Sequence, residues 1–163
     1  MKFDFPQVDL PCEILAWNDV TEDILNIYKQ SCRLKAGIFA ICTEGKMTAT
    51  INLIDYEIKP NDLITLLPGT IIQFRERTEK VRLCFAGFSS ECVERINLIK
   101  SMVSSFSKIT ECPIVELQED IASYLIDYFS LLARVTCDEK LSLPSEMTEV
   151  SLRSILTAVG LIY

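Results

Sequence analysis

The sequence contains no histidine. This absence removes the usual general base, the usual zinc ligand and the usual side chain that titrates near neutral pH. A Ser-His-Asp or Cys-His catalytic arrangement therefore cannot be built from this chain. Glycine is scarce as well, with five residues in 163, and none of them forms a glycine-rich phosphate loop. We expect no metal, no cofactor and no enzymatic activity.

Basic charge is also in short supply. The chain has 16 Lys+Arg against 23 Asp+Glu, which gives a formal charge of −7. Affinity for nucleic acid comes from clustered Lys and Arg, and the local basic cluster at 75–82 is interrupted by Glu76 and Glu79. This cluster indicates a charged hairpin rim. We therefore expect no contact between this stretch and DNA.

The chain also has no apolar N-terminal segment of the kind that a signal peptide needs, and no run of about 20 apolar residues that could span a membrane. Its seven cysteines are odd in number and at least eight residues apart, without a Cys-x-x-Cys pair. We interpret them as structural thiols of a cytoplasmic protein that does not contact membranes.

The first half of the sequence shows the signals of short strands. Apolar and polar residues alternate with a period of two, and turn residues such as Gly45 and Pro68-Gly69 separate the runs. The pattern predicts strands at 37–43, 47–54, 55–59, 63–67, 70–75 and 81–87. The first two form a hairpin in this prediction, and the whole series indicates a sandwich or barrel in a region spanning 1–88.

After Ser89 the apolar period becomes helical over 89–163. The stretch Ser89-Ser90-Glu91 offers an N-cap for a helix that carries Val93, Ile96, Ile99, Val103 and Phe106. A second helix after Pro113 carries an a/d seam: Leu117, Ile121, Tyr124, Tyr128 and Leu131. This seam packs either against a second subunit or against the strands of its own chain. A third helix is expected from about Ser145 toward Tyr163, and its apolar end in helical phase suggests a fragment of a longer protein.

The acidic residues have the pattern of solvated surface charge, so we do not expect them to form a functional site. The interior of the strand region is then the remaining place for one. If Met47, Ala49, Ile51 and Leu53 face inward, the same alternation turns several further side chains inward, and Trp17 closes one end. The candidate ligand-binding residues are Trp17, Tyr56, Phe74, Leu83 and Phe85. Two interpretations remain open: a filled core, or a barrel-mouth pocket for a small and largely apolar ligand.

The order of these pieces resembles one known family. The features are a Gly-initiated strand, the turn residue Gly45, and the spaced pattern of Tyr56, Ile58, Pro60, Asp62 and Leu63. The Pro68-Gly69 turn and an aromatic strand leading into a helix complete the pattern. Together they resemble the N-terminal sensor domain of AraC-type transcription regulators, particularly those of Bacteroides-like bacteria. The resemblance extends over about 36–116 and is looser beyond it.

The resemblance implies an α+β fold, with a cupin-like double-stranded β-helix at 1–88 and a helical dimerisation segment at 89–163. It also implies a homodimer that binds a small effector and contacts DNA only through a separate C-terminal module. By position, Trp17, Phe74, Leu83 and Phe85 correspond to regions that contribute ligand contacts in sugar-sensing members, but their apolar character makes a sugar an unsuitable ligand here. Two rival functions remain: an enzyme of the cupin superfamily, and an interaction module without a ligand.

Overall fold

A computed structural model of the chain describes residues 5–18, 26, 28–78, 80–97, 103–137 and 143–163. The described residues form ten strands and four helices. The strands are β1 (Gln7–Val8), β2 (Ile14–Trp17), β3 (Cys32–Leu34), β4 (Gly37–Glu44), β5 (Met47–Ile51), β6 (Ile54–Ile58), β7 (Asp62–Leu66), β8 (Ile71–Arg77), β9 (Arg82–Phe88) and β10 (Ile114–Glu116). The helices are α2 (Ser90–Ile96), α4 (Val103–Glu111), α5 (Glu119–Cys137) and α6 (Ser145–Ile162).

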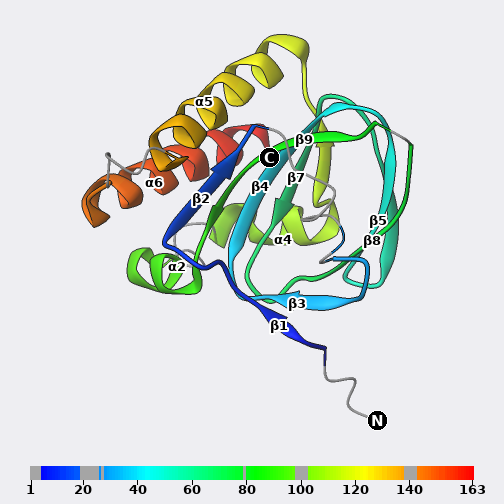
Figure 1. The fold of residues 1–163 in the computed structure, drawn as a ribbon, viewed down its shortest axis with the longest axis horizontal. Helices are drawn as coiled ribbons and strands as arrows, with labels where there is room; N and C mark the ends of the chain where they lie inside the picture. Colours follow the sequence, from blue (N-terminus) through cyan, green and yellow to red (C-terminus); the bar gives the residue numbers. More distant parts are fainter. Residues whose placement is uncertain (1–4, 19–25, 27, 79, 98–102, 138–142) are drawn as a thin grey trace.

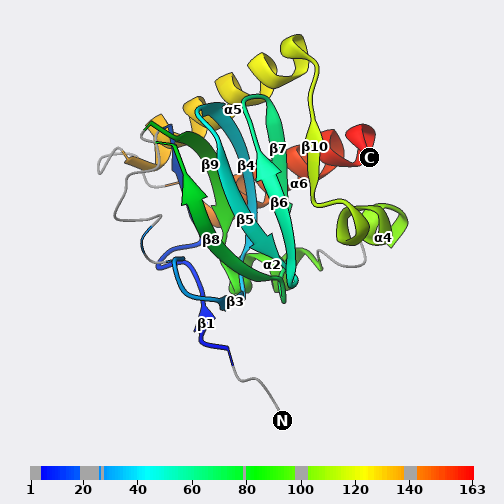
Figure 2. The same cartoon turned by 90° about the vertical axis from the view of Figure 1, so that its right-hand side faces the viewer.

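The strands are divided between two five-stranded sheets that face one another (Figures 1 and 2). The outer sheet has the strand order β1-β3-β8-β5-β6, and the central sheet has the order β10-β7-β4-β9-β2. Every pairing among the described strands is antiparallel except that of β1 with β3. The described strands thus form two separate sheets. The sequence predicted a sandwich or barrel, and the prediction of a closed barrel is wrong.

The central sheet is buried on both faces. Along β4, Phe39 and Ile41 contribute to a core on the helix side, whereas Ile38 and Ala40 contribute to a core between the two sheets. The same alternation occurs along β2, β7 and β9. We call these two cores the helix-side cluster and the inter-sheet cluster. The molecule therefore consists of three layers, with the helices on one side of the central sheet and the outer sheet on the other (Figure 1).

Helix α5 lies against β2 and β9. Its buried side chains are Ala122, Leu125, Phe129, Leu132 and Ala133, which recur at intervals that place them on one face of the helix. Helix α6 contributes Leu152, Ile155, Leu156 and Val159 to the same helix-side cluster. Its bounds agree closely with the helix expected from about Ser145. No helix among the described residues is long and apolar enough to cross a membrane.

Three strand predictions need correction. The runs at 37–43 and 47–54 do not form a hairpin, because β4 pairs with β7 and β9, whereas β5 pairs with β6 and β8. The second run is interrupted by a turn at Asn52 and Leu53, whose φ angles of 49° and 70° reverse the chain so that Ile51 faces Ile54. Leu53 was expected to face inward and is instead 70% exposed.

The helical half also differs from its prediction. The N-cap expected within Ser89-Ser90-Glu91 is supplied by Ser89, whose side chain accepts a hydrogen bond from the Cys92 amide. Helix α2 nevertheless ends at Ile96, and its C-cap residue Asn97 adopts a left-handed conformation with φ 54°. Phe106 belongs to the separate helix α4. The predicted position Ile99 lies outside the described residues. Strand β10, which pairs with β7, was not expected from the sequence. The division into a region 1–88 and a region 89–163 stays a prediction.

Candidate functional site

Two cross-strand rows of aromatic side chains line the space between the sheets. In the outer sheet, Tyr56 on β6 and Phe74 on β8 lie on either side of Ala49 on β5. All three belong to the inter-sheet cluster or pack against it. Because side chains on one face of neighbouring strands contact each other directly, the small Ala49 side chain leaves the two rings as the bulk of this row.

The central sheet carries the matching row. Trp17 on β2 lies opposite Phe85 on β9, which in turn lies opposite Ala40 on β4. Leu83, two residues before Phe85, is buried on the same face. Trp17 is half-buried, and its indole Nε1 is buried without a hydrogen-bond partner among the described residues. An indole N–H can only donate, so this site offers a donor to an acceptor on a ligand.

Tyr28 belongs to the same site and was missed in the sequence. Its ring meets that of Phe74 edge to face, with ring centroids 5.6 Å apart, and its backbone carbonyl accepts a hydrogen bond from the Phe74 amide. Burial raises the pKa of the Tyr28 phenol, so the group is neutral at physiological pH. Tyr28 lies outside the alternating strand runs, and therefore no periodic signal could have marked it.

The structure thus brings Tyr56 and Phe74 of the outer sheet, and Leu83, Phe85 and Trp17 of the central sheet, to the same space between the two sheets. That all of them face the inside of the molecule agrees with the alternation in the sequence. Their role in binding a ligand stays a prediction. The chemistry of this interior is apolar and aromatic, with phenol and indole groups as its polar functions.

Helix α5 has a second apolar stripe beside its buried face. Tyr124 is 67% exposed, Leu131 44% and Ile121 38%, while Tyr128 is half-buried at the edge of the helix-side cluster. Leu117 was expected in the same stripe, but it precedes α5 and is buried in the helix-side cluster. The stripe is therefore made of Ile121, Tyr124, Tyr128 and Leu131, and we refer to these four residues as the α5 stripe.

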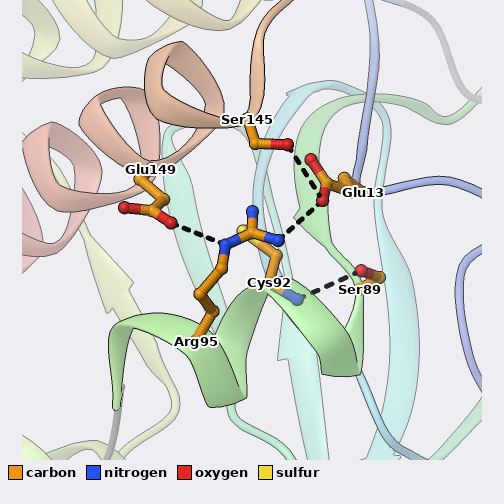
Figure 3. A network of polar contacts seen from close by, with 6 residues as sticks. All are labelled: Glu13, Ser89, Cys92, Arg95, Ser145 and Glu149. Carbon is orange, nitrogen blue, oxygen red and sulfur yellow. Dashed lines mark hydrogen bonds and ion pairs between the residues drawn. The ribbon is translucent and has the colours of Figure 1, made fainter.

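A polar network joins three segments on the helix side of the molecule (Figure 3). Arg95 of α2 donates from Nη1 to Glu13 at 2.7 Å, and from Nε to Glu149 of α6 at 2.6 Å. Ser145 at the start of α6 also reaches Glu13. The hydrogen bond from Arg95 lowers the pKa of the Glu13 carboxyl. Arg95 thus fixes α6 to α2 and to the residue before β2.

The buried thiols are poor nucleophiles. Burial raises the pKa of Cys84 to about 12, and those of Cys42 and Cys92 to about 11, so these groups stay protonated at neutral pH. Cys12 and Cys112 are exposed. Within the part of the chain that the structure describes, no group of three or more Cys, Asp or Glu side chains is placed to hold a metal ion.

The sequence matches no known family profile. It also matches no curated protein. Among solved structures, the fold is similar to the AraC-like transcriptional activator CuxR, with 10% identity and a TM-score of 0.48 over 87% of this chain and 45% of that one. ToxT from Vibrio cholerae gives 10% identity and a TM-score of 0.40 over 92% of this chain and 52% of its own. The chain spans about half the length of these two structures.

Proposed function

We propose that this chain is the effector-sensing and dimerisation domain of an AraC-type transcription regulator in the cytoplasm. The domain has no catalytic role in this proposal, and DNA is contacted by a separate module. The region 1–88 senses the effector, and the region 89–163 forms the subunit contact. The family assignment is supported by the spaced pattern from Tyr56 to Leu63 and by the α+β arrangement of two sheets and four helices.

The observation that carries the proposal is the position of α5 on the back of the aromatic row. Helix α5 contacts β2 and β9, the same two strands that present Trp17 and Phe85 to the inter-sheet space. Only the thickness of one sheet separates the two faces. An effector that shifts Trp17 or Phe85 therefore acts directly on the strands that support α5, which is the physical basis for coupling two sites.

The α5 stripe is the proposed subunit contact. Its four residues recur at spacings of three, four and three, the pattern with which helices pack side by side. A symmetric dimer brings the same stripe of each subunit together and removes the exposed parts of Ile121, Tyr124 and Leu131 from water. The buried face of α5 stays on its own sheet, so the contact requires no rearrangement of the helix-side cluster.

Sedimentation equilibrium tests the dimer. We expect the chain to be dimeric at micromolar concentration and Tyr124→Glu to be monomeric, because it introduces a charge into the centre of the α5 stripe. Ser123→Glu adds the same charge one residue away, at an exposed position outside the stripe, and should leave the dimer intact. A monomeric wild-type chain, or equal dissociation by both substitutions, contradicts the proposed contact.

The proposed effector is a small, largely apolar molecule that accepts a hydrogen bond from Trp17 Nε1. Since Trp17 is the single tryptophan, its fluorescence reports binding without labelling. A metabolite that raises the melting temperature and changes this fluorescence supports the proposal, because ligand that binds the native state stabilises it. Phe85→Ala should weaken such binding, whereas Glu57→Ala, an exposed change on β6, should not.

A ligand-free interaction module is the second candidate function. It is favoured by the burial of the inter-sheet cluster, in which small residues such as Ala49 and large ones such as Phe85 are both buried. The same screen separates the two functions. If no metabolite in a broad panel raises the melting temperature while the dimer persists, the interaction module is the better assignment.

A further inference from the structure

The first turn of helix α6 has little to hold it within the helix itself. Its N-cap residue is Pro144, whose side chain has no atom that accepts a hydrogen bond. The first amide groups of a helix have no partner within the helix, and a Ser, Thr, Asp or Asn side chain at the N-cap normally supplies one. The first three residues, Ser145, Glu146 and Met147, are exposed, so apolar burial does not anchor this turn either.

Glu13, the residue before β2, contacts this turn from outside the helix. Its carboxylate accepts a hydrogen bond from the Ser145 hydroxyl at 3.5 Å, and another from Arg95 Nη1 at 2.7 Å. Arg95 Nε donates to Glu149, one turn further along α6, at 2.6 Å (Figure 3). A carboxylate beside the start of a helix is also favoured by the helix dipole. The start of α6 is therefore held by side chains from two other segments of the chain.

Arg95 is the group that the two glutamates share. The side chains of Arg95, Glu13 and Glu149 are 31%, 30% and 29% exposed, so water screens these ion pairs less than fully exposed ones. The hydrogen bonds with Glu13 and Glu149 raise the pKa of Arg95, and the hydrogen bond from Arg95 lowers the pKa of Glu13. One charged guanidinium thus joins the residue before β2 to α6 through two charge-assisted hydrogen bonds.

Glu13 is fixed to the central sheet as well as to Arg95. Its backbone carbonyl accepts a hydrogen bond from the Ser89 amide at 3.0 Å, and the next residue, Ile14, begins β2. Trp17, at the other end of this short strand, packs against the inter-sheet cluster. A shift of β2 therefore moves Glu13 relative to Arg95, which is bonded directly to α6. This route does not pass through α5.

We propose that Arg95 is a positioning residue that makes the start of α6 follow the position of β2. When β2 shifts, Glu13 moves, the Arg95 guanidinium is displaced with it, and Glu149 loses its anchor. An effector that displaces Trp17 uses this route, and to that extent the inference rests on the proposed function. The contacts themselves need no effector and no second subunit. The test can therefore fail while the effector site and the α5 stripe remain, and the reverse.

Hydrogen exchange of the isotope-labelled chain, followed by NMR, tests the link from strand to helix. The amides of residues 149–151 bond to carbonyls in the first turn of α6, so they exchange faster when that turn opens. We expect Glu13→Ala to speed their exchange about two- to tenfold, the equivalent of one hydrogen bond, and Arg95→Met to do the same. Glu94→Ala is the control, because it removes an exposed carboxylate from α2 next to Arg95, and it should leave this exchange unchanged.

The link from helix to strand is read at Trp17. As the single tryptophan, it gives one indole N–H signal. Coupling between two sites is reciprocal, so Glu149→Ala on α6 should shift this signal. Glu146→Ala removes an exposed carboxylate from the same helix and should not shift it. In an Arg95→Met background, Glu149→Ala should have no further effect on the Trp17 signal, because the link is already broken.

The proposal is overturned if Glu13→Ala changes the exchange of α6 no more than Glu94→Ala does. It is equally overturned if the effect of Glu149→Ala on the indole signal persists in the Arg95→Met background, since the two glutamates then act without Arg95. The NMR signals of Phe129, which is fully buried in the helix-side cluster, show in each variant that the core is intact.

Discussion

Ala16 on β2 and Ala86 on β9 lie directly opposite each other, on the face of the central sheet that α5 covers. Both are 0% exposed. Two neighbouring alanines give the helix a flat and shallow surface on which to pack. The same two strands carry Trp17 and Phe85, which are much larger, on the opposite face. On β2 and β9, the central sheet thus presents small side chains to α5 and large side chains to the outer sheet.

Ala86→Leu tests this packing. The added side chain has no space between β9 and α5, and overpacking of this kind costs about 1–3 kcal/mol of the free energy of unfolding. Urea denaturation measures the loss. Glu57→Leu adds a leucine at an exposed position of β6 and should change stability by less than about 0.5 kcal/mol. Equal effects of the two substitutions would show that α5 does not pack closely on Ala86.

The two apolar faces of α5 should differ in their effect on folding. Phe129 is 0% exposed in the helix-side cluster, so Phe129→Ala should lower the free energy of unfolding by about 3–5 kcal/mol. Tyr124→Ala, five residues earlier on the exposed stripe, should have little effect when measured on monomeric protein. Thermal and urea unfolding at low protein concentration provide the comparison. A large loss for Tyr124→Ala would mean that the stripe packs within its own subunit.

Leu53 occupies a turn position that suits glycine. Its φ of 70° is unfavourable for a residue with a side chain by about 1–2 kcal/mol, and its exposed side chain recovers little through packing. Leu53→Gly places a glycine directly after Asn52, and Asn-Gly is the favoured sequence for this hairpin turn. After the greater unfolded-state entropy of glycine is subtracted, we expect a gain of about 0.5–1 kcal/mol in urea denaturation. A loss of stability would show that the Leu53 side chain makes a stabilising contact.

Two glycines with positive φ should respond unequally to alanine. At Gly45 a Cβ atom would collide with the backbone oxygen of Lys80, in addition to the strain of φ 81°. At Gly69 the φ is 92°, but no described atom lies within 4 Å of the new Cβ. Gly69→Ala should therefore cost about 1–2 kcal/mol from backbone strain alone, and Gly45→Ala clearly more. Similar losses in urea denaturation would contradict the close approach at Gly45.

The elements that the sequence predicted well are those with a long, uninterrupted period. Strand β4 and helix α6 agree with their predictions within a residue, because eight strand residues and eighteen helix residues give clear patterns. Strands β1, β3 and β10 have two or three residues each, which is too short for any period to register. The turn at Asn52 was hidden because Leu53 continues the alternation of apolar residues across it.

The candidate site was only partly accessible to such reasoning. The alternation of apolar residues identified Phe74 and Phe85, because side chains two residues apart in a strand point to the same face of the sheet. It could not identify the contacts of Arg95, whose partners Glu13 and Glu149 are 82 and 54 residues away in sequence. Sheet partners and buried polar groups are properties of tertiary structure.

The buried thiols make the protein sensitive to alkaline pH. Cys84 has an ordinary pKa of 9.0, which burial raises to about 12 in the folded state. Between these values the unfolded chain loses the Cys84 proton while the folded chain keeps it, so rising pH favours unfolding; below pH 9 the contribution is fully present. From pH 8 to pH 10, Cys84 alone should lower the free energy of unfolding by about 1.4 kcal/mol. Urea denaturation under reducing conditions at both pH values measures this loss. Cys84→Ala should reduce the pH dependence by that amount, and parallel behaviour of the variant and the wild-type chain would show that the Cys84 thiol ionises in the folded protein as readily as in the unfolded one.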